Sequence, residues 1–226
     1  MPDHARPLVG WLAASGVVVL WSSWVVVSRL GVAQTLTIYD IMALRFLVAT
    51  VAVAPFAWRY WPRHLSWWQI TVIASCQGVF FLVFAFGGLQ FAPAAHAGII
   101  INGSLPIFSA LIGWLWLKDR PDRRQSIGMV IILAGCALVG SDRTSVGVGA
   151  DVWVGQLMFL AAALSVAVNM IATRAWQLTA MQAMVSIPTF NLALFGPLYL
   201  AFLPTALTES PWSEILLQAI YQGVGP

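Results

Sequence analysis

The sequence predicts an all-α membrane protein that crosses the bilayer several times and is built from two inverted five-helix repeats. Hydrophobic residues make up 60% of the 226 residues and charged residues only 8%, whereas a soluble domain carries about 25% charged residues. The apolar residues gather into stretches long enough to cross a bilayer core of roughly 30 Å. Parts of the chain also repeat at a spacing of 145 residues, which is the third observation behind this fold class.

Eight apolar spans follow one another along the chain. We expect them at residues 8–31, 40–58, 67–91, 94–117, 127–141, 152–173 and 180–203, with the eighth starting at Trp212. A signal peptide is the alternative interpretation of the first span, but this span is longer than the apolar core of a usual signal peptide, and further spans follow it. Cys76 and Cys136 lie inside spans without metal-ligand spacing, so we expect no metal and no cofactor.

The internal repeat predicts how the spans are organised. A shift of 145 residues places Trp67 on Trp212, and the Gln-Gly-Val of residues 77–79 on the Gln-Gly-Val of residues 222–224. Chance similarity between apolar segments is the alternative. Because each period contains five spans, an odd number, the second copy must be inserted upside down relative to the first. Inverted repeats of this kind enclose a site at the membrane midplane in transporters.

These boundaries divide the chain into three parts. The first repeat covers residues 1–142, an external connector rich in Gly and Ser covers 143–151, and the second, inverted repeat covers 152–226. The second copy stops before the counterparts of its last spans, so we expect a complete protein of about 290 residues with ten spans.

Basic residues in the loops predict the orientation. With the N-terminus inside, the basic residues on the cytoplasmic side are Arg6, Arg59, Arg63, Lys118, Arg120, Arg123, Arg124 and Arg174. The clearly external exception is Arg143. This asymmetry follows the positive-inside rule and predicts a multi-pass membrane protein with a cytoplasmic N-terminus. Because these charges sit in short loops between apolar spans, we expect no nucleic-acid partner.

The fourth span carries a stripe of small and polar residues. Gly98, Asn102, Pro106, Ala110 and Gly113 recur at spacings of four, four, four and three, which places them on one side of a helix. Small residues let another backbone come close or leave open space, and a proline frees the carbonyl four residues before it. The stripe therefore predicts one wall of a cavity.

The candidate substrate-binding residues lie on the first, third and fourth spans and are mainly aromatic, amide or small. They are Trp21, Trp24, Gln77, Phe80, Phe84, Gly98, Asn102 and Pro106. A cavity of this kind suits a flat or apolar substrate held by a few polar groups. Helix packing, or the aromatic belt at the membrane interface, is the alternative role of the aromatic residues.

Two ionisable residues are candidates for a charge or proton role. Arg45 lies inside the second span, where it either meets a substrate carboxylate or has a structural role, and Asp40 begins the same helix as a cap. His96 lies near the outer end of the fourth span, where it either gates the path or relays a proton, or is a satisfied structural histidine.

Several short motifs together resemble the EamA-type drug/metabolite transporters. They are the opening Gly-Trp-Leu, Trp21-Ser22-Ser23-Trp24, Arg45, Pro106-Ile107-Phe108, and Lys118-Asp119-Arg120 followed by Ile127-Gly128 and Leu133-Ala134-Gly135. One departure is Asp119, where the family usually has Glu. The resemblance implies an exporter of small metabolites with ten helices. Within the family, it points to the aromatic amino acid exporters of bacterial inner membranes.

The expected mode of action follows from this resemblance and from missing motifs. The sequence has no nucleotide-binding P-loop and no hydrolase or zinc-protease signature. We therefore expect a non-enzymatic transporter that works by alternating access and is either driven by a gradient or runs downhill. Its partners are a small-molecule substrate and the lipid bilayer, and it is expected to be a monomer or a weak homo-oligomer. The alternatives are an intramembrane enzyme acting on a lipid or isoprenoid and a structural or assembly subunit.

Overall fold

The computed structural model describes residues 35–141 and 151–224, together with parts of the segment 10–30. Throughout residues 35–141 and 151–224 the regular structure is helical. The helices are α2 (Ile38–Tyr60), α3 (Trp67–Gln77), α4 (Val79–Phe91), α5 (Ala94–Leu117), α6 (Arg123–Ser141), α7 (Val152–Ala175), α8 (Ala180–Phe202) and α9 (Trp212–Val224). Trp21, Trp24 and nearly all of the connector 143–151 lie outside the described residues.

Five segments of the described chain are long and apolar enough to cross a membrane. They are Ile38–Tyr60, Trp67–Phe91, Ala94–Leu117, Val152–Ala175 and Ala180–Phe202. The predicted all-α, polytopic class is confirmed, and these segments agree with the predicted spans to within two residues at each end. The span predicted over 127–141 begins earlier, at Arg123. The reason is local, because the Asp122 carboxylate accepts a hydrogen bond from the Gln125 backbone N–H and caps the helix.

Polar caps fix where two of the long helices start. Thr37 caps α2 and Thr179 caps α8, and in each case the third helical residue, Asp40 or Gln182, reciprocates in a capping box. The prediction that Asp40 lies at the start of α2 is correct, although Thr37 is the cap residue. In both helices the backbone N–H groups of the cap residue and of the third helical residue are therefore satisfied.

The third span is interrupted in its middle by a break that the apolar pattern did not predict. Gly78 lies between α3 and α4 with φ −103° and ψ −103°. Proline does not cause this break. Pro55, Pro106, Pro188 and Pro197 all lie inside continuous helices, while the broken span contains none.

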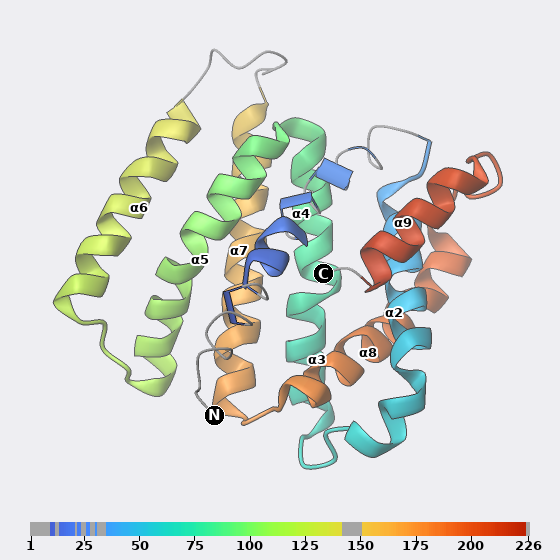
Figure 1. Ribbon diagram of the computed structural model, residues 1–226, viewed down its shortest axis with the longest axis horizontal. Helices are drawn as coiled ribbons and strands as arrows, with labels where there is room; N and C mark the ends of the chain where they lie inside the picture. Colours follow the sequence, from blue (N-terminus) through green and yellow to red (C-terminus); the bar gives the residue numbers. More distant parts are fainter. Residues whose placement is uncertain are drawn as a thin grey trace, which may run out of the picture.

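The helices pack around two main contacts, which are easiest to follow in Figure 1. In the first, α7 packs against α4 and α5. There the backbones come close at Gly155, where an added Cβ would lie 2.8 Å from the carbonyl oxygen of Gly88. In the second, α2 packs against α8 and α9, and α3 also contacts α8. Helix α6 lies at the edge of the bundle beside α5 (Figure 1).

Helices α2 and α8, which the repeat relates to each other, run in opposite directions. Asp40 near the start of α2 accepts a hydrogen bond from Tyr199 near the end of α8, at 2.5 Å. Six residues further along α2, the ring of Phe46 packs edge-on against Phe195, four residues earlier in α8. An antiparallel pair of this kind is the arrangement that an inverted repeat requires.

Candidate functional site

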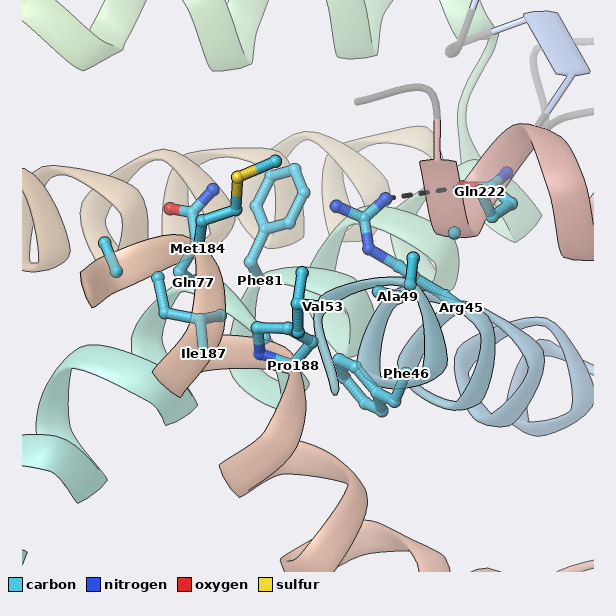
Figure 2. Close-up of a pocket in the computed structure, with 14 residues that line it drawn as sticks. Arg45, Phe46, Ala49, Val53, Gln77, Phe81, Met184, Ile187, Pro188 and Gln222 are labelled. Atoms are coloured by element: carbon cyan, nitrogen blue, oxygen red, sulfur yellow. Dashed lines mark hydrogen bonds between the residues drawn. The ribbon is translucent and has the colours of Figure 1, made fainter. Parts of the chain in front are cut away.

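A cavity of about 270 Å³ lies between α2, α8, the broken helix α3–α4 and the end of α9 (Figure 2). We call it the central cavity. Its lining residues are Arg45, Phe46, Ala49, Ala52, Val53, Gln77, Gly78, Phe81, Ala183, Met184, Ile187, Pro188, Gln222 and Gly223. Its volume is just below the ~300–1,000 Å³ typical of ligand pockets. The space therefore suits a small molecule.

The two copies of the repeated Gln-Gly dipeptide meet at this cavity. Gln77 ends α3 and Gly78 follows it at the break, while their counterparts Gln222 and Gly223 lie in α9. Both glycines allow a close approach. A Cβ on Gly78 would lie 2.1 Å from the Asn191 side chain of α8, and one on Gly223 would lie 2.6 Å from Val48 of α2. Each glycine thus seats its helix against the long helix of the other repeat.

Arg45 places a positive charge in the wall of an otherwise largely apolar space. It lies seven residues after the start of α2, which corresponds to about 10 Å of helix rise. Its guanidinium donates one long hydrogen bond, of 3.5 Å, to Oε1 of Gln222. Among the residues that the structure describes, no carboxylate lies within ion-pair distance of it. The charge is therefore only partly compensated by the protein.

A row of amides continues from Arg45 along α9. Gln222 Nε2 donates to Gln218 Oε1 at 3.2 Å, and Gln218 Nε2 donates to the carbonyl oxygen of Val27 at 3.0 Å. Both glutamine side chains are buried, with 1% exposure. Because each amide is held by a neighbour, Gln222 presents its oxygen toward Arg45 in a fixed orientation.

Asn191 of α8 holds the broken helix together at the cavity wall. Its Oδ1 accepts from the backbone N–H of Val79 at 3.2 Å, and its Nδ2 donates to the carbonyl of Ala74 at 2.8 Å. Asn169 of α7 donates to the next carbonyl toward the N-terminus, that of Ile73, at 2.8 Å. A break inside a membrane is tolerated when its backbone groups find such partners.

Figure 2 shows how the polar groups are distributed around the central cavity. Gln77 lies beside Met184 on one side of the view, Arg45 and Gln222 lie on the other, and Phe81 lies between them. This arrangement can hold an anionic group at the Arg45 end and an apolar group against the remaining walls. In the described ranges, no three His, Cys, Asp or Glu residues come together as a metal-ligand set.

A second polar cluster joins the two repeats at the end where α2 begins. Besides the Tyr199 hydroxyl, the buried Asp40 carboxylate accepts the backbone N–H of Ala206, at 3.0 Å, and both the N–H and the hydroxyl of Thr37. The cluster ties the start of α2 to the end of α8 and to the loop after it. It therefore closes this end of the α2–α8 contact.

Two of the predicted site residues line the central cavity, namely Gln77 and Arg45. The others on the third span do not line it. Phe80 is half exposed at the surface, and Phe84 packs on the hydrophobic core. His96 is buried between α5 and α7, where its Nδ1 lies 3.3 Å from the Gln156 amide nitrogen. The structure leaves the substrate-binding and proton roles of these residues as predictions.

The small-residue stripe of α5 also lies away from the central cavity. Asn102 is exposed, and its amide donates back to the carbonyl of Gly98 at 2.8 Å. Pro106, Ala110 and Gly113 instead line a second hollow between α5, α6 and α7. From Pro106 to Gly113 the stripe is therefore a wall of this second hollow, and it does not line the central cavity.

Several residues that line the central cavity or hold the helix break beside it were not among the sequence candidates. Gln222 and Gly223 were visible in the repeat but were not carried into the site, although their counterpart Gln77 was. Asn169 and Asn191 were missed altogether. The available signal was an asparagine inside each of two apolar spans, since an amide in a membrane needs a partner and often marks a functional position.

Two comparisons with known proteins match transporters, and a third matches the fold. The profile of the EamA-like transporter family matches residues 8–141. An uncharacterized transporter of Bacillus subtilis (strain 168), YwfM, is 32% identical over 128 residues, which are 55% of this chain and 42% of that protein. The match thus spans less than half the length of that relative. One solved crystal structure superposes on 95% of this chain and 74% of its own, with TM-score 0.64 and 22% identity, which supports the fold alone.

Proposed function

Because the chain belongs to the EamA-like transporter family, we propose that it is a secondary transporter of the bacterial inner membrane that exports small metabolites. The substrates we propose are amino acids with aromatic or other apolar side chains. Membership in a transporter family favours transport over catalysis. We also propose a cytoplasmic N-terminus. The loops after α2, α5 and α7, which contain or adjoin the basic residues, lie at the same end of the bundle (Figure 1), and positive charge favours the cytoplasmic side.

The observation that carries the substrate class is Arg45. Its guanidinium faces a small, largely apolar cavity and has a single weak amide partner there among the described residues. An incoming carboxylate would complete the partner set of a cation that is costly to hold inside a membrane. Phe46, Phe81 and Met184 line the same space and offer contact to an aromatic or aliphatic side chain. A zwitterionic, apolar amino acid matches both properties.

The position of the cavity supports alternating access. It lies between α2 and α3 of the first repeat and α8 and α9 of the second, and the Gln-Gly dipeptides of both copies line it. Rocking one repeat against the other around such a site would expose it to each side in turn. In this scheme the Asp40–Tyr199 cluster is a contact that must open on the outer side.

Counterflow in proteoliposomes tests this function. The full-length protein should exchange labelled L-phenylalanine but not labelled phenethylamine, which keeps the ring and the amine but lacks the carboxylate. Arg45→Gln should slow phenylalanine exchange about tenfold or more, because a charge-assisted contact is lost, and should remove the discrimination. Arg59→Gln, a basic residue at the end of the same helix, is the matched control and should leave exchange unchanged. Equal exchange of both solutes by the wild type would contradict the proposal.

A further inference from the structure

The second hollow of the molecule has a charged end and an apolar end. It has a volume of about 380 Å³ and lies between α5, α6 and α7, with Arg120 and Arg174 at one end and Pro106 and Ile132 at the other. We call it the basic groove. Because α6 packs against α5 at the edge of the bundle (Figure 1), the groove lies beside the lipid-facing surface of α6. That surface includes the exposed Ile131.

The charged end of the basic groove carries an excess of positive charge. Arg120 and Arg174 line it. Lys118, Arg123 and Arg124 lie within four residues of Arg120 in the sequence, and the same segment holds two carboxylates. One carboxylate, Asp119, is bound by Arg174 at 3.0 Å, and the other, Asp122, caps α6. Across residues 35–141 and 151–224, no carboxylate pairs with the remaining four cations. The end of the groove is therefore complementary to an anion.

The apolar part has the length of one lipid leaflet. Pro106 lies eleven residues before the end of α5 at Leu117, which corresponds to about 16 Å of helix rise. Half of a bilayer core of roughly 30 Å is about 15 Å. Gly128 of α6 keeps this part open, since a Cβ added there would have no atom within 4 Å. A chain entering the groove thus meets small and apolar side chains as far as the bilayer midplane.

We propose that the basic groove is a binding site for an anionic phospholipid, with its phosphate between Arg120 and Arg174 and one acyl chain along Gly113 and Gly128. A free phosphate would use the charged end but would leave the apolar part unfilled. A zwitterionic lipid would fill the apolar part but carries no net charge to match the cations. Basic pockets between membrane helices recognise anionic headgroups by this combination.

Native mass spectrometry of the purified full-length protein tests the site. After incubation with phosphatidylglycerol or phosphatidylcholine of the same acyl chains, the protein should retain phosphatidylglycerol preferentially. Arg120→Gln and Arg174→Gln should each weaken its retention about fivefold, the usual effect of one basic residue near an anionic lipid. Arg59→Gln removes a positive charge from the end of α2, which does not line the basic groove, and should not change retention.

A glycine pair tests the apolar part. Gly128→Leu fills the basic groove and should abolish the preference for phosphatidylglycerol, whereas Gly128→Ala should keep it. Gly135→Leu is the matched control, since it lies on the same helix, has equally open surroundings and does not line the groove. Melting temperatures of all variants verify that each is folded. Equal retention of the two lipids, an unchanged preference in Gly128→Leu, or displacement of the lipid by glycerol 3-phosphate or phenylalanine would overturn the site.

Discussion

The central cavity and the basic groove differ in how they treat their charges. In the central cavity, one arginine lies inside the membrane with a single amide partner in the described chain. In the basic groove, the arginines lie at the end of the bundle, and Arg174 and its partner Asp119 are more than half exposed. A cation costs much more in the first setting than in the second. Arg45 is therefore suited to pair with a substrate carboxylate, whereas the exposed arginines are suited to contact lipid headgroups.

The two sites also differ in symmetry. The central cavity receives the same dipeptide, Gln-Gly, from both repeats, so both halves contribute equivalent groups. The basic groove is formed by α5 and α6 of the first repeat and α7 of the second, and no repeated motif meets there. Equivalent contributions suit a site around which two halves move. The lateral position of the basic groove suits a fixed contact with the bilayer.

The largest expected effect is at Arg45. Arg45→Leu should raise the half-saturating phenylalanine concentration in counterflow about 10- to 100-fold, because a charge-assisted contact worth about 1.5–3 kcal/mol is lost. Arg120→Leu in the basic groove should change it less than about twofold, since exposed charges contribute little. Similar losses in both variants would erase the distinction between the two sites.

The next effect concerns the break between α3 and α4. Asn191→Leu leaves the N–H of Val79 without its partner and should lower the free energy of unfolding by about 1–3 kcal/mol. Asn102→Leu changes an exposed amide that bonds within its own helix, so about 0.5 kcal/mol or less is expected. Thermal unfolding in detergent compares the two. Equal shifts would mean that Asn191 does not hold the break.

Smaller and matched effects are expected at the two repeated glutamines. Gln77→Leu and Gln222→Leu should each raise the half-saturating concentration about two- to tenfold, as expected for one neutral hydrogen bond of about 0.5–1.5 kcal/mol. Counterflow with labelled phenylalanine measures both. An effect at only one of them would show that the two repeats do not contribute equally to the central cavity.

The smallest effect on stability is expected at the ion pair beside the basic groove. Asp119→Asn removes the partner of Arg174 at an exposed position, so the unfolding free energy should change by about 0.5 kcal/mol or less after screening by solvent. The same change frees a cation, so phosphatidylglycerol retention should rise. A fall in retention would contradict the role of Arg174 in the charged end.

The sequence was sufficient for the helices but not for the sites. Span lengths follow from apolar runs and caps, so α5 was predicted from residue 94 to residue 117, as the structure has it. The break at Gly78 was not predictable from α3 alone, because its partner Asn191 lies 113 residues later in the chain. Gln77 was predicted because it is an amide inside the third span, and Arg45 because it is a charge inside the second. Both line the central cavity. Helical periodicity could not tell which neighbour a face meets, and part of the α5 stripe lines the second hollow instead of the central cavity.

The proposed transport function requires that the central cavity is the passage between the two sides of the membrane. Ala49 of α2 lines this cavity, whereas Ala134 of α6 is exposed on the outer surface of the bundle. With Cys76 and Cys136 replaced by alanine, each position is converted to cysteine and treated with an impermeant thiol reagent from one side at a time. We predict that Ala49→Cys is labelled from either side and protected by phenylalanine, while Ala134→Cys is labelled from neither. Labelling of Ala49→Cys from one side only, or without protection, would contradict the account.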